Sequence, residues 1–261
     1  MAGKTLIGGT AYEVTGGKTL INGTAYSIAG GKTLVNGTAY DISFGVDLAE
    51  LFGGMTVLRT NGRNSGSTGR ITIEVVSNYL NTGETGYIFS FFNGYMSIAK
   101  IVCGTAGTQA IYQSSESYGN CWYALSYDAI WYHDTMNNGY NSKYGATLAL
   151  VKFDQPEAKV DAVLSKLQYV ASNGRNYSYN DLLSIANSSI PDGNFIFVAH
   201  GSNFAINLKQ GNETVINLGG NCSDRPTMLY LKSGGYYYVH TSNMGEGTYA
   251  YGATIHVVQG G

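Results

Sequence analysis

Histidine side chains are the first groups in this sequence that could carry out catalysis or bind a metal. Four are present, at His133, His200, His240 and His256, and none has a second histidine or a cysteine at the spacing of metal ligands. His200-Gly201-Ser202 holds two members of a Ser-His-acid triad, but no acidic residue stands at a supporting spacing. His133 and His240 occupy matching points of an internal repeat, and we interpret both as strand residues rather than as a shared functional pair.

Acidic residues and cysteines add no catalytic pattern. Hydrolysis of glycosides needs two carboxylates that flank the bond, and the acids here are spread along the chain. We interpret Asp47 and Asp161 as helix N-caps. Cys103, Cys121 and Cys222 form no C-x-x-C pair, and no nucleophile-elbow, zincin, P-loop or dinucleotide motif occurs. We therefore predict no enzyme activity, no metal site and no cofactor.

Aromatic residues form the one cluster in the sequence that resembles a binding site. Tyrosines and tryptophans crowd residues 112–140 and again residues 230–251. Alternation along strands would bury about half of each set, and core packing is the favoured role for any single member. The others could stack on sugar rings or fill a protein interface. Our candidate ligand-binding residues are Tyr118, Trp122, Trp131, Tyr132, Tyr236 and Tyr237.

The charge balance excludes one class of partner. Fifteen basic and 17 acidic residues give a net charge of −2, which supplies no basic field for phosphates, so we predict no nucleic-acid partner. Residues 1–12 lack the basic and apolar regions of a signal peptide, and no run approaches roughly 18 apolar residues. We expect synthesis and assembly in a cytoplasm, without membrane insertion.

The first 44 residues repeat one 14-residue pattern three times: GKTLIGGTAYEV from Gly3, GKTLINGTAYSI from Gly17 and GKTLVNGTAYDI from Gly31. Within the second and third units, two β-prone runs flank an Asn-Gly pair, which is the strongest short-range signal for a β-hairpin. A two-residue turn would place Leu20 opposite Ala25 and Ile21 opposite Thr24. Each unit therefore predicts one hairpin.

Both faces of such a hairpin are partly apolar, and a single hairpin is only marginally stable in water. We expect burial against neighbouring repeats and against the same region of other chains, which would form a homotrimeric stalk. The alternative is a meander that lies on its own globular domain. The residues predicted to hold the oligomer together are Leu6, Ile7, Leu20, Ile21, Tyr26, Leu34, Val35 and Tyr40.

The rest of the chain repeats itself on a larger scale. Asn61-Gly62-Arg63-Asn64 recurs as Asn173-Gly174-Arg175-Asn176, an offset of 112 residues. Two further matches, of residues 87–89 with 195–197 and of 144–147 with 251–254, have offsets of 108 and 107. Three ordered matches at a nearly constant offset predict two copies of one β-domain, at residues 45–154 and 155–261. Together with the N-terminal repeats at residues 1–44, the chain is predicted to have three domains.

Within each copy, β-prone runs alternate with Asn, Gly and Ser about every ten residues. This pattern is typical of a β-sandwich or jelly roll. Helical spacing of apolar residues predicts short helices at residues 46–51, 157–170 and 180–187. The predicted fold is therefore mainly β, with N-terminal hairpin repeats followed by two duplicated sandwich-like domains that carry short helices.

The GKTL-x-x-GTAY units resemble N-terminal repeats of virion proteins encoded by phages and prophages of gut Firmicutes. The resemblance is limited to residues 3–42 and implies a particle anchor or trimer-forming stalk below an exposed C-terminal part. It implies no catalytic residue. It leaves open whether such a protein belongs to the tail, the neck or the capsid surface.

Together these features predict a non-enzymatic structural protein of the bacteriophage surface: a fibre, a tail-associated protein or a capsid decoration protein. Its expected partners are further copies of itself, other virion proteins and glycans of the host surface. The first alternative is a purely structural component that contacts only virion proteins. The second, less favoured, is a cell-wall-degrading enzyme.

Overall fold

The computed structural model describes the backbone of the N-terminal strands and most of the chain from residue 48 onward. Contacts divide the chain into two compact units, residues 1–48 and 49–261. Side chains are described for residues 48–62, 72–105, 107–114, 146–174, 185–211, 218, 220 and 253–260. Backbone alone is described for residues 3–7, 10–14, 17–21, 24–28, 30–35, 38–43, 121–126, 129–134, 184, 214–217, 219, 221, 228–232 and 235–239.

The N-terminal strands pair as three antiparallel hairpins, each a separate two-stranded sheet. In the second hairpin Leu20 is opposite Ala25 and Ile21 is opposite Thr24. The other two repeats have the corresponding register. The pairs are β1 (Gly3–Ile7) with β2 (Thr10–Val14), β3 (Gly17–Ile21) with β4 (Thr24–Ile28), and β5 (Gly30–Val35) with β6 (Thr38–Ser43).

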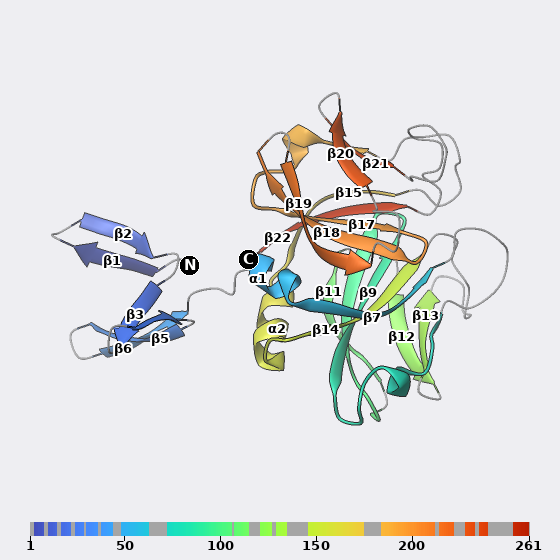
Figure 1. Cartoon of the computed structure of the whole chain (residues 1–261), viewed down its shortest axis with the longest axis horizontal. Helices are drawn as coiled ribbons and strands as arrows, with labels where there is room; N and C mark the ends of the chain where they lie inside the picture. Colours follow the sequence, from blue (N-terminus) through green and yellow to red (C-terminus); the bar gives the residue numbers. More distant parts are fainter. Residues whose placement is uncertain are drawn as a thin grey trace. The chain divides into compact units, whose positions relative to one another are not determined.

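The second unit is mainly β and consists of two successive halves (Figure 1). The first half begins with a short helix, and its strands form a five-stranded antiparallel sheet of order β11-β10-β9-β14-β7 and a three-stranded sheet of order β12-β13-β8. Its elements are α1 (Leu48–Gly53), β7 (Met55–Gly62), β8 (Thr72–Ile73), the 3-10 turn η1 (Val76–Asn78), β9 (Thr85–Phe92), β10 (Tyr95–Val102), β11 (Gln109–Gln113), β12 (Cys121–Ser126), β13 (Ala129–Asp134) and β14 (Thr147–Phe153).

The second half has the same order of elements. Its five-stranded sheet is ordered β15-β22-β17-β18-β19 and its three-stranded sheet β16-β21-β20. Its elements are α2 (Glu157–Leu164), β15 (Gln168–Gly174), β16 (Ser184–Ala186), η3 (Asn187–Ser189), β17 (Phe195–His200), β18 (Asn203–Gln210), β19 (Thr214–Asn221), β20 (Met228–Lys232), β21 (Gly235–Val239) and β22 (Thr254–Gln259).

Irregularities in the two large sheets fall at matching places. The pairing of β7 with β14 shifts register beside Leu58, and that of β15 with β22 shifts beside Val170. A second shift follows Ile98 in the first half and Ile206 in the second. Because β-bulges are local structural features and not required by strand pairing, their repetition is a second likeness beyond strand order.

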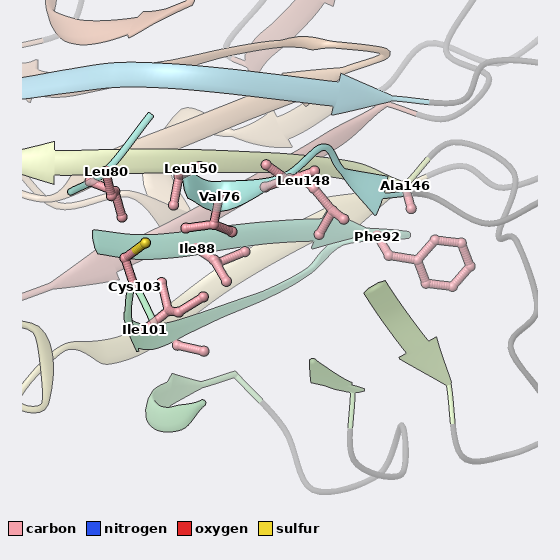
Figure 2. Close-up of a cluster of buried hydrophobic side chains, with 11 residues drawn as sticks. Val76, Leu80, Ile88, Phe92, Ile101, Cys103, Ala146, Leu148 and Leu150 are labelled. Atoms are coloured by element: carbon pink, nitrogen blue, oxygen red, sulfur yellow. The ribbon is translucent and has the colours of Figure 1, made fainter. Parts of the chain in front are cut away.

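Each half has its own hydrophobic core on one face of its large sheet. In the first half this core joins β9, β10 and β14 to β8 and η1, and Figure 2 shows Ile88, Leu148 and Leu150 within it. The second core contains Ile196, Val198, Ile255 and Val257 among others. Side chains that alternate with these along each strand point to the opposite face of the sheet.

That opposite face joins the two halves through phenylalanine rings. Phe89 of β9 packs 6.1 Å from Phe197 of β17 and 6.3 Å from Phe204 of β18, measured between ring centroids. Phe91 lies 5.7 Å from Phe204. All four rings are fully buried, and full burial of one phenylalanine contributes roughly 1.5–3 kcal/mol. The large sheets therefore pack face to face across an aromatic layer.

Three local expectations are wrong. The helix predicted through residue 170 ends at Leu164, because residues from Gln168 onward pair with β22 as a strand. Residues 184–186, predicted as helix, form strand β16, which is held by pairing with β21. Asp161 is not an N-cap: it lies inside α2 and bonds across to the first sheet. Asp47 lies outside the described residues, as do residues 180–183.

No helix within the described residues has the length and apolar character needed to cross a membrane.

Candidate functional site

The predicted aromatic site residues lie in the two three-stranded sheets. Trp122 belongs to β12, Trp131 and Tyr132 to β13, and Tyr236 and Tyr237 to β21. The backbone register places Tyr132 opposite Tyr123 and Tyr237 opposite Tyr230. The two sets thus occupy corresponding sheets of the two halves, not one common sheet. Their side chains, and the whole of Tyr118, lie outside the described residues.

The residues predicted for oligomerisation lie in the N-terminal hairpins, where the backbone alone is described. Leu6 and Ile7 belong to β1, Leu20 and Ile21 to β3, Tyr26 to β4, Leu34 and Val35 to β5, and Tyr40 to β6.

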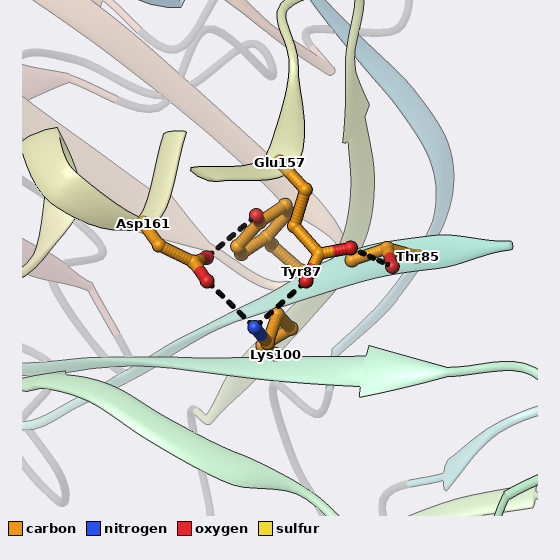
Figure 3. Close-up of polar contacts among 5 residues, drawn as sticks. All are labelled: Thr85, Tyr87, Lys100, Glu157 and Asp161. Carbon is orange, nitrogen blue, oxygen red and sulfur yellow. Dashed lines mark hydrogen bonds and ion pairs between the residues drawn. The ribbon is translucent and has the colours of Figure 1, made fainter. Parts of the chain in front are cut away.

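A polar cluster joins helix α2 to the first large sheet (Figure 3). The Lys100 ammonium on β10 donates to Asp161 at 2.6 Å and to Glu157 at 2.9 Å, both on α2. The hydroxyl of Tyr87 donates to Asp161 at 2.7 Å, and that of Thr85 donates to Glu157 at 2.6 Å. The two carboxylates are at positions i and i+4, so they share one face of the helix.

The electrostatics of this cluster hold Lys100, Glu157 and Tyr87 in their ordinary charge states. Hydrogen bonds to Asp161 and Glu157 raise the pKa of Lys100, so the amine stays protonated. The hydrogen bond from Thr85, followed by that from Lys100, lowers the pKa of Glu157. Burial, and then the hydrogen bond to Asp161, raise the pKa of Tyr87. A general base or nucleophile needs a pKa near the working pH, so the cluster is suited to fastening α2 rather than to catalysis.

A second polar group lies between the two halves, around the fully buried ring of His256 on β22. Its Nδ1 lies 2.8 Å from the carbonyl oxygen of Gly94, and its Nε2 lies 3.0 Å from the hydroxyl of Tyr112. A carbonyl oxygen can only accept, so Nδ1 carries the hydrogen and Nε2 of the neutral ring accepts from Tyr112.

Burial controls the titration of this group. It lowers the pKa of His256 to about 4, although the hydrogen bond to Gly94 opposes the shift. Burial also raises the pKa of Tyr112, with a smaller contribution from Tyr169. The Tyr169 ring, 51% exposed, lies 5.5 Å from the His256 ring. His256 is therefore neutral near pH 7 and shielded from solvent, which suits a structural role.

Glycines of the repeated Asn-Gly-Arg-Asn motif permit close backbone contacts between the two halves. A Cβ on Gly62 would overlap the backbone of Gly201, and one on Gly174 would overlap the backbone of Asn93 and Gly94. Those backbone atoms belong to the β17–β18 and β9–β10 hairpins of the opposite halves. Each motif glycine thus leaves room for the hairpin of the other half.

A buried threonine accompanies each of these contacts. The hydroxyl of Thr147 donates to the carbonyl oxygen of Gly201 at 2.5 Å, and the amide of Gly94 donates to the hydroxyl of Thr254 at 3.3 Å. Thr147 and Thr254 begin the corresponding strands β14 and β22. The repeated motif was visible in the sequence, but nothing in it indicated that the two copies would contact each other's hairpins.

Most of the remaining histidine candidates from the sequence lie on described strands and turns. Gly201 and Ser202 form the turn between β17 and β18, where Gly201 has a φ of +59°, and His200 ends β17. His133 is opposite Trp122 in the β12–β13 pairing, and His240 lies outside the described residues. Among the residues that the structure describes, no group of three His, Cys, Asp or Glu could hold a metal ion, and Cys103 is free and buried.

Searches against known protein families, curated proteins and solved structures find no match for this chain.

Proposed function

We propose that this chain is a non-enzymatic structural protein on the surface of a bacteriophage particle. In this proposal the N-terminal hairpins form an oligomeric stalk, and residues 49–261 form a head exposed to the surroundings. The observation that carries the proposal is the separation of three repeated hairpins from the rest of the chain as a compact unit of their own. Their resemblance to repeats of phage virion proteins is the second support.

The stalk follows from the stability of small sheets. Within the described backbone, each N-terminal hairpin pairs only its own two strands. A two-stranded hairpin is marginal in water unless a further surface covers it. Burial of about 1,000 Å² of apolar area would supply roughly 25 kcal/mol before the cost of association, which is about 4–15 kcal/mol. Three repeats in each of three chains could provide that area, so a homotrimer is our preferred assembly.

The head is an internal duplication of one β-sandwich-like domain. Matching strand order, matching register shifts and the nearly constant sequence offset support this interpretation. The position of the aromatic residues in corresponding three-stranded sheets makes those sheets the preferred ligand-binding surfaces of the head. Host-surface glycans are the proposed ligands, because tyrosine and tryptophan faces stack on sugar rings.

A purely structural role, with contacts to virion proteins only, is the competing proposal. No acidic residues stand at matching positions in the strands of the two three-stranded sheets, and hydrolysis of glycosides needs two carboxylates. This favours binding of glycans over their hydrolysis. A glycan array probed with the full chain separates the two roles. Binding that Trp131→Ala and Tyr237→Ala both weaken supports the adhesin. Tyr169→Ala, which removes a half-exposed tyrosine of β15 outside the three-stranded sheets, is the matched control. No binding to any glycan or to host envelope material would overturn glycan recognition and leave the structural role.

A further inference from the structure

The two halves of the head exchange their leading helices. Phe52 lies in α1, the helix that begins the first half. Its ring centroid lies 5.3 Å from that of Phe195 and 5.4 Å from that of Phe197, both in the second half. Helix α2, which precedes the second half, bonds through Asp161 to strands of the first half. Each half therefore places its first helix on the large sheet of the other.

The hairpin contacts have the same reciprocal pattern. Gly62 of the first half receives the hairpin at Gly201, and Gly174 of the second half receives the hairpin at Asn93 and Gly94. Thr147 and Thr254 add one hydrogen bond at each end. When the same feature on each partner contacts the corresponding feature of the other, the interface has the form found in two-fold symmetric dimers.

The covalent connection between the halves contributes little to these contacts. It consists of Asp154, Gln155 and Pro156, of which Asp154 and Pro156 are exposed. Gln155 accepts a hydrogen bond from Lys159 of the adjoining helix, a contact local to α2. The contacts named above in the aromatic layer, the exchanged helices and the hairpins involve none of these three residues.

We propose that the surface joining the two halves is a recognition surface that accepts the complementary half of a second copy of this chain. Two copies can then exchange halves, and the partner is a second copy rather than a different protein. The inference rests on the geometry of residues 49–261 and is independent of the proposed place on a phage particle.

The test uses the full chain with a protease recognition sequence inserted between Asp154 and Gln155. After cleavage, we expect both fragments to elute together at the volume of the uncut chain, in a one-to-one complex by native mass spectrometry. Two cleaved chains with different mass tags, unfolded together and refolded by dilution, should yield hybrid complexes. Fragments that separate after cleavage, or that refold or aggregate without forming hybrids, would overturn the proposal.

Variants of the cleaved chain locate the recognition surface. Gly174→Val, which overlaps the opposite hairpin, should weaken association of the fragments at least about tenfold. Gly53→Ala, where an added Cβ meets no atom within 4 Å, should leave association unchanged. Equal association in both variants would contradict the assigned surface. Circular dichroism of the uncut Gly174→Val chain distinguishes a weakened interface from an unfolded chain. If the variant does not fold, hybrid formation by the unmodified cleaved chain still decides the proposal.

Discussion

Acid should weaken the head through His256, and the size of the effect follows from its buried position. The histidine pKa of about 6.5 in the unfolded chain falls to about 4 in the folded protein. The unfolded state therefore binds the proton more readily. The stability that the neutral ring contributes is complete above pH 6.5 and is lost as the pH falls from there toward 4.

The expected loss can be calculated from these two pKa values. Lowering the pH from about 7.5 to about 5 should reduce the free energy of unfolding by about 2 kcal/mol, and full protonation by about 3.4 kcal/mol. Hydrogen bonds to lysine or threonine side chains lower the pKa of three carboxylates, Glu84, Glu157 and Asp192, so these groups titrate below this range. The range from pH 7.5 to pH 5 therefore reports mainly on histidines.

Urea unfolding of the wild type and of His256→Asn at several pH values isolates this histidine from the other three. The asparagine amide can still donate to Gly94, but Tyr112 loses its acceptor, so the variant should be about 1–3 kcal/mol less stable near pH 7.5. That difference should shrink by about 2 kcal/mol at pH 5, because the variant has no ring to protonate. Tyr112→Phe, which keeps the histidine, should retain the wild-type dependence on pH. A constant difference between the wild type and His256→Asn would refute the reasoning.

Three further predictions concern the contacts between elements. Gly174→Val in the uncut chain should lower the free energy of unfolding by about 2 kcal/mol or more in thermal or urea unfolding, whereas Gly53→Ala should stay within about 0.5 kcal/mol; equal effects would contradict the close approach of the hairpin. Asp161→Asn should lower the free energy of unfolding by about 1–2 kcal/mol, because Lys100 and Tyr87 lose a charged partner. Glu74→Gln, which breaks the exposed pair with Arg59, should lower it by less than about 0.5 kcal/mol. Removal of residues 1–44 should convert the oligomer to a monomer in sedimentation velocity without changing the unfolding of the head, and an unchanged oligomer would show that the repeats do not carry assembly.

Patterns that act over a few residues could be predicted from the sequence. The Asn-Gly pairs indicated the hairpin register of Leu20 and Ala25, and β-prone runs marked most strands of the large sheets. Sequence offsets also aligned Asn61 with Asn173, which pair with the corresponding residues Leu148 and Ile255. Each of these features depends on turn chemistry or on alternation within one strand.

Features that depend on contacts between distant residues could not be predicted. Val163, Leu167 and Val170 have helical spacing, but pairing with β22 draws the chain from Gln168 into a strand. Asp161 has the residue type of an N-cap, and only the approach of Lys100 and Tyr87 gives it a different role. His256 carried no sequence signal, since its two partners lie 144 and 162 residues away. Burial and hydrogen bonding at such separations appear only with the assembled sheets.

Cryo-electron microscopy of particles of the phage proposed to encode this chain tests the proposed function most directly. We expect the chain in purified particles, with its head at the outer surface, and three copies joined through residues 1–44. Absence of the chain from particles that contain all their other structural proteins, or its enclosure inside the capsid, would contradict the proposed function.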